Sequence, residues 1–151
     1  MDCSFMAALF LPDKASAQVN RFFSEYPDSR TLHVPMLWWY ELTNVLCMAE
    51  RKKILKEVDV QRITGLLSGF PMETDEAQGV SYIRRLYEIA RTYGLSSYDA
   101  AYLELAIRVD GRLATLDKEL IAAAHACGVI THPMRRTSKR LQISQLPPEI
   151  A

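Results

Sequence analysis

The sequence predicts a single α/β domain in which a parallel sheet is covered by helices on both sides. Short β-branched or apolar segments alternate with longer stretches of helical periodicity, a pattern typical of strand–helix–strand units. A chain of 151 residues is long enough to bury a substantial core. In such folds the functional crevice lies beyond the carboxyl ends of the strands, so polar residues at those ends are candidates for a site.

The first half of the chain is predicted to hold two short helices, a strand and a long helix. Ser4 is expected to cap a helix over residues 4–11, and a second helix is expected over residues 14–26. The β-branched alternation of residues 31–34 predicts a strand. Pro35 is expected to open a helix that runs to about residue 51, because proline suits a first helical turn.

The second half of the chain is predicted to alternate helices and strands. The expected helices cover residues 58–67, 75–93 and 117–127, and a further one starts at Ser96 or Ser97 and runs to about residue 109. The expected strands cover residues 70–73, 112–115 and 129–131. Val80, Ile83, Tyr87 and Ala90 recur at helical spacing and predict one apolar stripe. Gly94 and Gly128 are expected to end two of the helices, because glycine readily takes the left-handed conformation found there.

The charge balance, the cysteines and the lack of long apolar runs indicate which kinds of protein this sequence does not predict. Lys plus Arg and Asp plus Glu each number 18, so the sequence does not predict a generally basic nucleic-acid-binding surface. A bound metal could still supply positive charge locally.

Cys3, Cys47 and Cys127 form no CxxC pair, so we expect free thiols in a reducing compartment. With no apolar run long enough to span a bilayer and no signal peptide expected, the predicted location is the cytoplasm.

Motifs for several common chemistries are absent from the sequence. It contains neither of the phosphate-binding loops GxxxxGK(S/T) and GxGxxG, nor the nucleophile motif GxSxG. His33, His125 and His132 are scattered without the spacing of metal ligands. Nucleotide-binding loops, a serine hydrolase and a histidine metal site are therefore not expected.

Four acidic residues stand at strand ends or on helices within apolar sequence. They are Asp2, Glu41, Asp99 and Asp117. Carboxylates that converge among apolar residues repel one another and are costly to desolvate unless a positive charge lies between them. The set therefore points to a divalent metal and to metal-assisted chemistry on an anionic substrate.

Each of these acids also has a purely structural explanation. Asp2 and Asp99 can stabilise the first turn of a helix, because anions interact favourably with its positive end. Asp117 can cap the helix that follows it, and Glu41 can lie on the polar edge of a helix. Considered one at a time, the acids leave both interpretations open.

Neighbouring residues favour a functional role. Glu41 and Asn44 share a helix face and could hold a metal or its water. The apolar segment AAYLELA after Asp99 predicts a helix buried on two sides. Thr115, two residues before Asp117, offers a hydroxyl to the same pocket.

Other polar and aromatic residues are given structural roles. Tyr98, Tyr102, Trp38 and Trp39 are expected in the core or at an interface, and Glu104 and Asp110 are expected to be solvated. Residues 132–151 form a separate basic tail after a domain over residues 1–131, with Arg135, Arg136, Lys139 and Arg140 clustered there. This tail is either a solvated arm or a segment that grips RNA phosphates or a partner subunit.

The order of the four acids resembles the PIN domain, most closely the VapC-type toxins of bacterial and archaeal toxin–antitoxin pairs. The stretches that carry the resemblance are DCS, VPMLWWYELTNVL, YGLSSYDAAYLELA and LATLDKELIAAAHACGV. The resemblance implies a three-layer α/β/α sandwich with a central parallel sheet. It also implies a homodimer that cleaves RNA internally with Mg²⁺ or Mn²⁺ and is neutralised by a cognate antitoxin.

The same resemblance implies roles for individual residues. Asp2, Glu41, Asp99 and Asp117 would hold one or two metal ions and act as the catalytic acids. Asn44 and Thr115 would be supporting polar groups. A metal-bound water would attack an RNA phosphodiester, and the antitoxin would inhibit by covering the acid pocket.

One departure from the family pattern concerns the first strand. Family members have a short apolar strand before the first Asp, whereas only Met1 precedes Asp2 here, so the strand is expected to be truncated because the numbered start is late. Two alternatives to a nuclease follow from the sequence. A catalytically silent PIN-like module would bind RNA or a protein, and a phosphate-accepting receiver domain would need a second acid beside Asp2, which the sequence lacks.

Overall fold

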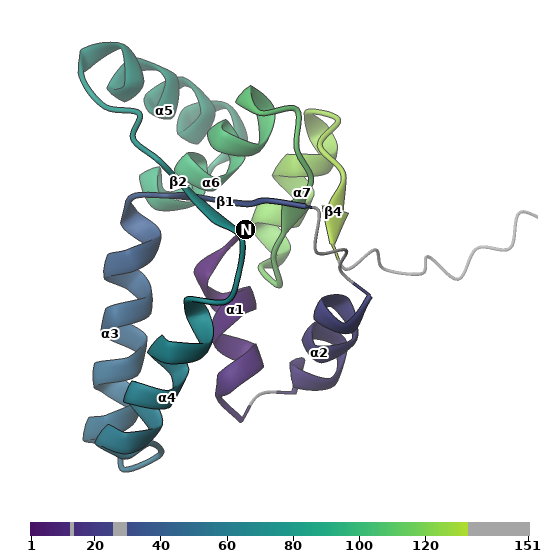
Figure 1. Ribbon diagram of the computed structural model, residues 1–151. Helices are drawn as coiled ribbons and strands as arrows, with labels where there is room; N and C mark the ends of the chain where they lie inside the picture. The colour runs from purple at the N-terminus through teal and green to yellow at the C-terminus, as the bar shows by residue number, and fades with distance from the viewer. Residues whose placement is uncertain (13, 26–29, 133–151) are drawn as a thin grey trace, which may run out of the picture.

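The computed structural model describes residues 1–12, 14–25 and 30–132, and these form seven helices and four strands (Figure 1). In chain order they are α1 (Cys3–Phe10), α2 (Ser16–Ser24), β1 (Leu32–Pro35), α3 (Leu37–Arg51), α4 (Glu57–Leu67), β2 (Met72–Asp75), α5 (Val80–Tyr93), α6 (Ser97–Arg108), β3 (Leu113–Ala114), α7 (Lys118–Ala126) and β4 (Thr131–His132). The predicted tail beyond His132 lies outside the described residues.

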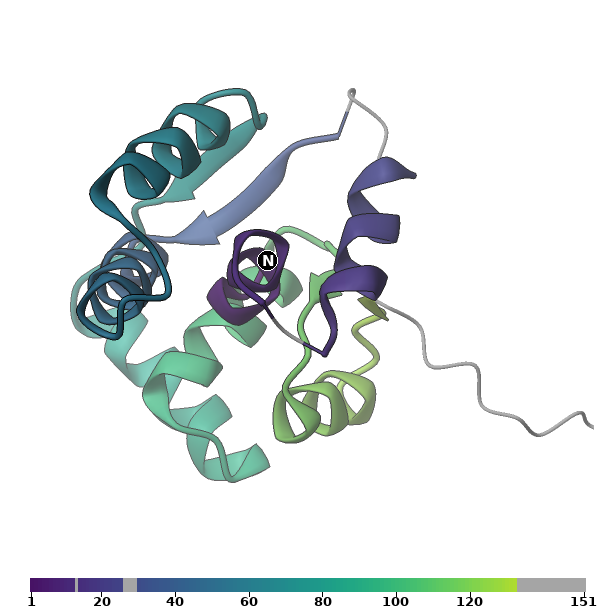
Figure 2. The ribbon, with the colours of Figure 1, turned by 90° about the horizontal axis from the view of Figure 1, so that it is seen from below.

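The strands are parallel and helices lie on both sides of them, which confirms the predicted α/β/α class (Figures 1 and 2). β1 pairs with β2, with Leu32 opposite Met72, and β3 pairs with β4, with Leu113 opposite Thr131. The predicted central sheet is therefore found as two two-stranded halves. The residues that separate the halves explain why.

Met1 and Asp2 lie between the two halves of the sheet. The Met1 amino nitrogen donates to the His33 carbonyl oxygen of β1 at 2.8 Å, and the Asp2 amide donates to the Ala114 carbonyl oxygen of β3 at 2.9 Å. Successive residues thus bond to opposite neighbours, as in the central strand of a parallel sheet. The chain enters α1 at the next residue, Cys3.

The helix caps combine confirmed and corrected predictions. Ser96 caps α6 and Asp117 caps α7, each through its side chain, and Gly94 ends α5 with φ of 68°. Asp2, not Ser4, caps α1, because its carboxylate accepts the amide hydrogen two residues on. Pro35 closes β1 and does not open α3, since a strand end loses little from a missing amide donor.

α6 is the central helix of the core. Every residue from 100 to 106 is buried, as the apolar run AAYLELA predicted, and the helix contacts both β1 and β3. The largest fully buried side chains around it are Trp38, Phe5, Met6, Leu103, Leu113 and Leu120. Burying each such side chain contributes about 1.5–3 kcal/mol, so the core holds α6 firmly under both halves of the sheet.

The apolar stripe predicted on α5 is not buried. Val80, Ile83 and Tyr87 are 77%, 65% and 62% exposed. α5 packs on α6 through a different face, with Ile89 and Tyr93 partly buried against the core. Helical spacing correctly groups residues on one face, but it does not say whether the same chain covers that face.

Candidate active site

The Asp2 carboxylate is buried and held by three donors. Its Oδ2 accepts hydrogen bonds from the hydroxyls of Ser4 at 2.7 Å and Thr115 at 2.8 Å, and its Oδ1 accepts from the Ser4 amide at 3.3 Å. The start of α1 supplies the Ser4 donors, and the end of β3 supplies Thr115, which is fully buried. The carboxylate is thereby fixed where the strands end.

Thr115 also connects Asp2 to the turn that contains Asp117. The Thr115 hydroxyl oxygen accepts a hydrogen bond from the Asp117 amide at 3.1 Å. The exposed Asp117 carboxylate in turn accepts from the Leu120 amide at 2.8 Å and so caps α7. One buried hydroxyl therefore sets the relative position of two of the predicted site acids.

Glu41 projects from α3 toward α6 and is half-buried. Its Oε2 accepts a hydrogen bond from the Tyr102 hydroxyl. Burial raises the pKa of the Glu41 carboxyl above its ordinary value, and the Tyr102 hydrogen bond opposes that shift. The negative charges of Asp2 and Asp99 each raise the same pKa further.

Asp99 lies in the first turn of α6 and is oriented by the residue that caps that helix. The Ser96 hydroxyl donates to Asp99 Oδ2 at 2.7 Å, and the Asp99 amide donates to the Ser96 hydroxyl oxygen at 3.1 Å. Tyr102, one turn later, holds Glu41. α6 therefore presents one site acid directly and positions another.

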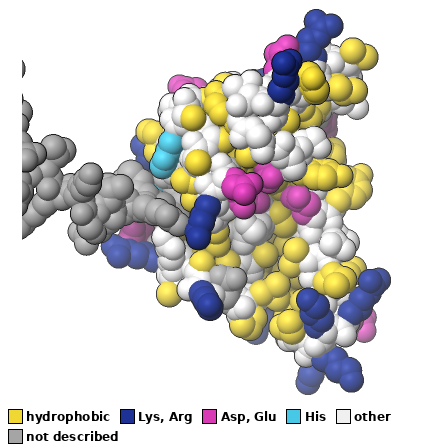
Figure 3. Space-filling view, turned by 180° about the vertical axis from the view of Figure 1, so that it is seen from behind, with side chains coloured by type: hydrophobic (Ala, Val, Ile, Leu, Met, Phe, Trp, Pro, Cys, Tyr) yellow, Lys and Arg dark blue, Asp and Glu magenta, His cyan; other side chains and the backbone are white. Residues whose placement is uncertain are grey.

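The structure thus places Asp2 and Asp99 within electrostatic reach of Glu41, and Thr115 ties Asp117 to Asp2. Asn44, the other predicted supporting residue, lies exposed one turn after Glu41 on α3. Figure 3 shows acidic side chains gathered near the middle of one face of the molecule, with hydrophobic surface beside them.

The donors in this region are oxygens suited to a hard divalent cation. Within residues 1–12, 14–25 and 30–132, no three His, Cys, Asp or Glu side chains lie close enough to hold a metal ion as they stand. Burial first, and the charges of Asp2 and Asp99 after it, raise the Glu41 pKa, and a cation near these carboxylates would oppose that effect. Carboxylates are the type of ligand that Mg²⁺ and Mn²⁺ prefer.

One residue beside these acids was not predicted in its observed role. Tyr102 was expected only as a core or interface aromatic; it is buried, and burial together with its bond to Glu41 raises its pKa far above the usual value. The sequence did offer one indication of this role, because a residue three positions after Asp99 lies on the same face of the helix. Of the other aromatics in that group, Trp38 is buried and Tyr98 is largely exposed.

Glu104 was predicted to be solvated, and this was wrong. It is 3% exposed and accepts hydrogen bonds from Arg85 on α5 at 2.8 Å and from Arg108 at 3.0 Å. Arg108 also pairs with Asp75 on β2 at 2.7 Å. Arginines from α5 and from α6 itself thus pair with this buried acid, and the network fastens α5 and β2 to α6.

The cysteines are free, as predicted. Burial raises the pKa of the Cys3 thiol to about 12, and the charges of Glu41 and Asp2 add to that effect. Cys3 is therefore an unreactive neighbour of the acids. In the described part of the chain, no helix has the length and apolar character needed to cross a bilayer.

Comparison with known proteins identifies the family. The PIN domain matches residues 1–126. The chain belongs to the PIN-domain family. It is 31% identical over 120 residues to a protein named ribonuclease VapC3 from Pyrobaculum aerophilum, covering 80% of this chain and 89% of that protein.

A solved structure supports the same assignment. The crystal structure of PAE2754 from Pyrobaculum aerophilum superposes with a TM-score of 0.62 at 25% identity, covering 86% of this chain and 80% of that one. The region that matches the PIN domain, residues 1–126, contains all four acids considered above. Together these similarities confirm the predicted resemblance to VapC-type PIN proteins.

Proposed function

We propose that this PIN-domain protein is a metal-dependent endoribonuclease that acts as the toxin of a type II toxin–antitoxin pair. The observation that carries the proposal is the PIN-domain match over residues 1–126, which contain Asp2, Glu41, Asp99 and Asp117, with Asp2 and Glu41 held by the hydroxyls of Thr115 and Tyr102. The name of the relative, ribonuclease VapC3, supports RNA as the substrate. The reaction would be hydrolysis of phosphodiester bonds by an activated water.

Each residue of the site has a proposed role. Asp2, Glu41, Asp99 and Asp117 would hold Mg²⁺ or Mn²⁺ as the catalytic acids. When bound, the ion would lower the pKa of a water and offset negative charge on the phosphate.

The surrounding polar groups would position the carboxylates for metal binding. Thr115 holds the Asp2 carboxylate and the backbone of Asp117 in fixed relation. Tyr102 orients Glu41 and favours its ionised form. Asn44, near Glu41 on α3, would contact the water or the phosphate from the solvent side.

Three further features complete the proposal. A homodimer would cover the exposed α5 stripe of Val80, Ile83 and Tyr87, which a lone chain leaves in water. A cognate antitoxin would inhibit by covering the acid pocket, and the site of action would be the cytoplasm. The basic segment 132–151 would follow the nuclease domain 1–131 as a tail that binds RNA phosphates or a partner.

Cleavage of RNA by the purified protein tests the nuclease proposal. We expect cleavage of a mixed RNA pool with Mg²⁺ or Mn²⁺, no cleavage in EDTA, and at least a hundredfold loss in Asp99→Asn. Asp110→Asn, an exposed acid just beyond the other end of α6, is the matched control and should retain activity. Activity that survives both EDTA and Asp99→Asn would refute the mechanism. RNA binding without cleavage under either metal would favour the silent PIN-like module instead.

A further inference from the structure

Cations cluster at the turn that joins α3 to α4. Arg51, Lys52, Lys53 and Lys56 are all exposed there, and we call residues 51–56 the basic turn. Within the described residues, none of these four side chains forms an ion pair with an acid. Lys and Arg side chains gather at this end of the molecule, on the face that also shows the acidic side chains (Figure 3).

The acids nearest the basic turn do not neutralise it. Asp59 Oδ2 accepts a hydrogen bond from the Lys56 amide at 2.8 Å, and Glu57 lies beside it in the first turn of α4. Carboxylates at that position interact favourably with the positive end of the helix. Glu50 directly precedes Arg51, so the two side chains leave α3 about 100° apart around its axis. The cations are therefore available to an anionic ligand.

Lys53 occupies a backbone conformation that suits glycine better than lysine. Its φ is 58°, which is the left-handed region, and it follows the C-cap Lys52, where glycine is the usual residue. The turn is fixed, because the Lys53 amide donates to the Glu50 carbonyl at 2.8 Å and the Ile54 amide to the Ala49 carbonyl at 2.9 Å. A lysine at this place indicates a use for its charge, since the fold alone favours glycine.

An exposed row of side chains on α3 joins the basic turn to the acids. Tyr40, Asn44, Cys47 and Arg51 recur at helical spacing on one face, and all four are exposed. Arg51 follows Glu41 by ten positions, so a rise of about 1.5 Å per residue places it about 15 Å further along the helix. The row itself contains no carboxylate, so an anionic strand can follow it without repulsion.

We infer that the basic turn binds phosphates of the RNA substrate, a few nucleotides away from the bond that is cleaved at the acids. The identity of the polyanion as RNA rests on the proposed function. The strand follows the exposed row of α3, with Asn44 near the acids and Arg51 at the basic turn. Because phosphates are the groups held, this binding is insensitive to base sequence and strongly dependent on salt.

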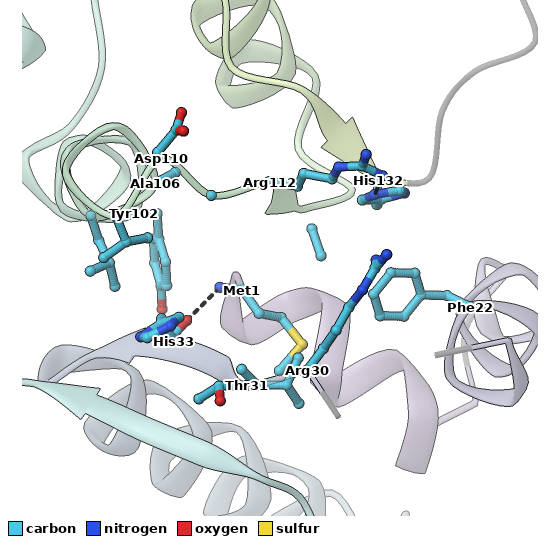
Figure 4. A pocket seen from close by; sticks show the side chains of 15 residues that line it. Met1, Phe22, Arg30, Thr31, His33, Tyr102, Ala106, Asp110, Arg112 and His132 are labelled. Atoms are coloured by element: carbon cyan, nitrogen blue, oxygen red, sulfur yellow. Dashed lines mark hydrogen bonds between the residues drawn. The ribbon is translucent and has the colours of Figure 1, made fainter. Parts of the chain in front are cut away.

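Binding of a single-stranded RNA of about fifteen nucleotides in EDTA tests the basic turn without cleavage. Lys52→Gln combined with Lys56→Gln should weaken binding at least tenfold. The slope of log affinity against log salt should fall by about 1.4, since each phosphate contact contributes about 0.7. Arg30→Gln combined with Arg112→Gln is the matched control, because it removes two charges at a separate pocket beside Met1 (Figure 4). The control should change the affinity less than twofold.

Lys53→Gly separates binding from folding, because the two should change in opposite directions. Glycine relieves the left-handed conformation, so the midpoint of thermal unfolding should rise by about 2 °C. The affinity for RNA in EDTA should nevertheless fall about threefold. An unchanged affinity, or a fall in both the midpoint and the affinity, would contradict a role for the Lys53 charge.

The rate of cleavage with Mn²⁺ distinguishes this inference from the nuclease proposal. The double variant Lys52→Gln/Lys56→Gln should raise KM for the long RNA at least fivefold more than KM for a dinucleotide, which is too short to reach the turn. A chain that binds RNA through the basic turn but cleaves none would refute the proposed function and leave this inference intact.

Other outcomes would overturn the inference. Equal affinities of the original chain and the double variant would show that the basic turn does not bind RNA. Equal weakening by the variant and by its matched control would show only an effect of net charge. If poly-glutamate of similar length displaced RNA at equal charge, the turn would be a site for an acidic protein segment instead.

Discussion

At the scale of single residues, Thr115 is the side chain on which the arrangement of the acids depends most. It is fully buried, donates to Asp2 at 2.8 Å and accepts from the Asp117 amide at 3.1 Å. Its hydroxyl therefore determines how the end of β3 and the start of α1 meet.

Replacing this hydroxyl by a methyl group should damage both folding and activity. Thr115→Val keeps the shape but leaves the Asp2 oxygen and the Asp117 amide without a partner, which should cost about 1–3 kcal/mol in the free energy of unfolding. We expect at least a tenfold loss of RNA cleavage, measured at a temperature where the variant is fully folded. Thr115→Ser keeps the hydroxyl and should recover most of that activity. Equal activity of the Val and Ser variants would remove Thr115 from the site.

Tyr102 acts on Glu41 through one hydrogen bond. That bond favours ionised Glu41 and lowers its pKa, against the burial that raises it. In Tyr102→Phe the opposing effect is lost, the Glu41 pKa rises, and a given fraction of ionised carboxylate is reached only at higher pH. The acid limb of the pH profile for RNA cleavage should therefore move to higher pH, while Tyr98→Phe, an exposed tyrosine on the same helix, should leave it unmoved. A limb that stays in place, or moves to lower pH, would contradict this role.

The sequence could predict some of these residues and not others. Asp2, Glu41, Asp99 and Asp117 stood out because each is an acid in apolar surroundings, and their structural environments are now known. Asp99 and Asp117 were also predictable from local helix chemistry. The hydrogen bond between Tyr102 and Glu41 spans 61 positions, and no local pattern predicts a contact of that kind.

At the scale of elements, α6 organises the molecule. It carries Asp99 and Tyr102 at one end and Glu104 and Arg108 further along. Helical periodicity located this helix and its buried run correctly. The prediction that Glu104 is solvated was wrong because its partner Arg85 lies on α5, 19 positions earlier, where no local pattern indicates the contact.

Removing the charge of Glu104 should loosen the attachment of α5 and β2. Glu104→Gln weakens its bonds to Arg85 and Arg108, whose side chains are 45% and 36% exposed and can be partly solvated instead. We therefore expect a loss of about 1–3 kcal/mol in the free energy of unfolding, less than for a fully buried pair. Urea unfolding measures it, with Glu119→Gln on the exposed surface of α7 as the control. An unchanged urea midpoint in Glu104→Gln would mean that the network contributes no net stability.

At the scale of the whole molecule, sequence patterns predicted the class of fold but not how its sheet is divided. Alternation of strands and helices sufficed to predict parallel strands covered on both sides. The separation into two halves depends on Met1 and Asp2, which bridge them with one hydrogen bond to each side. The exposure of the apolar stripe on α5 could not be predicted either, because it depends on which segments pack beside that helix in space.

The acids are also a property of the whole fold. The residue that caps α1 and the helices α3 and α6 each contribute one carboxylate, and the end of β3 connects a fourth. Burial raises the pKa of the Glu41 carboxyl, and the charges of Asp2 and Asp99 raise it further. The central claim is that a divalent cation bound among them is required for RNA cleavage.

The most direct test is the rate of RNA cleavage as Mn²⁺ is added to metal-free protein, with the original chain and Glu41→Gln followed side by side. The original chain should be inactive before addition and should reach a saturating rate. Glu41→Gln should need at least tenfold more Mn²⁺ or remain inactive. Full cleavage without metal, or identical Mn²⁺ dependence in the two proteins, would contradict the claim.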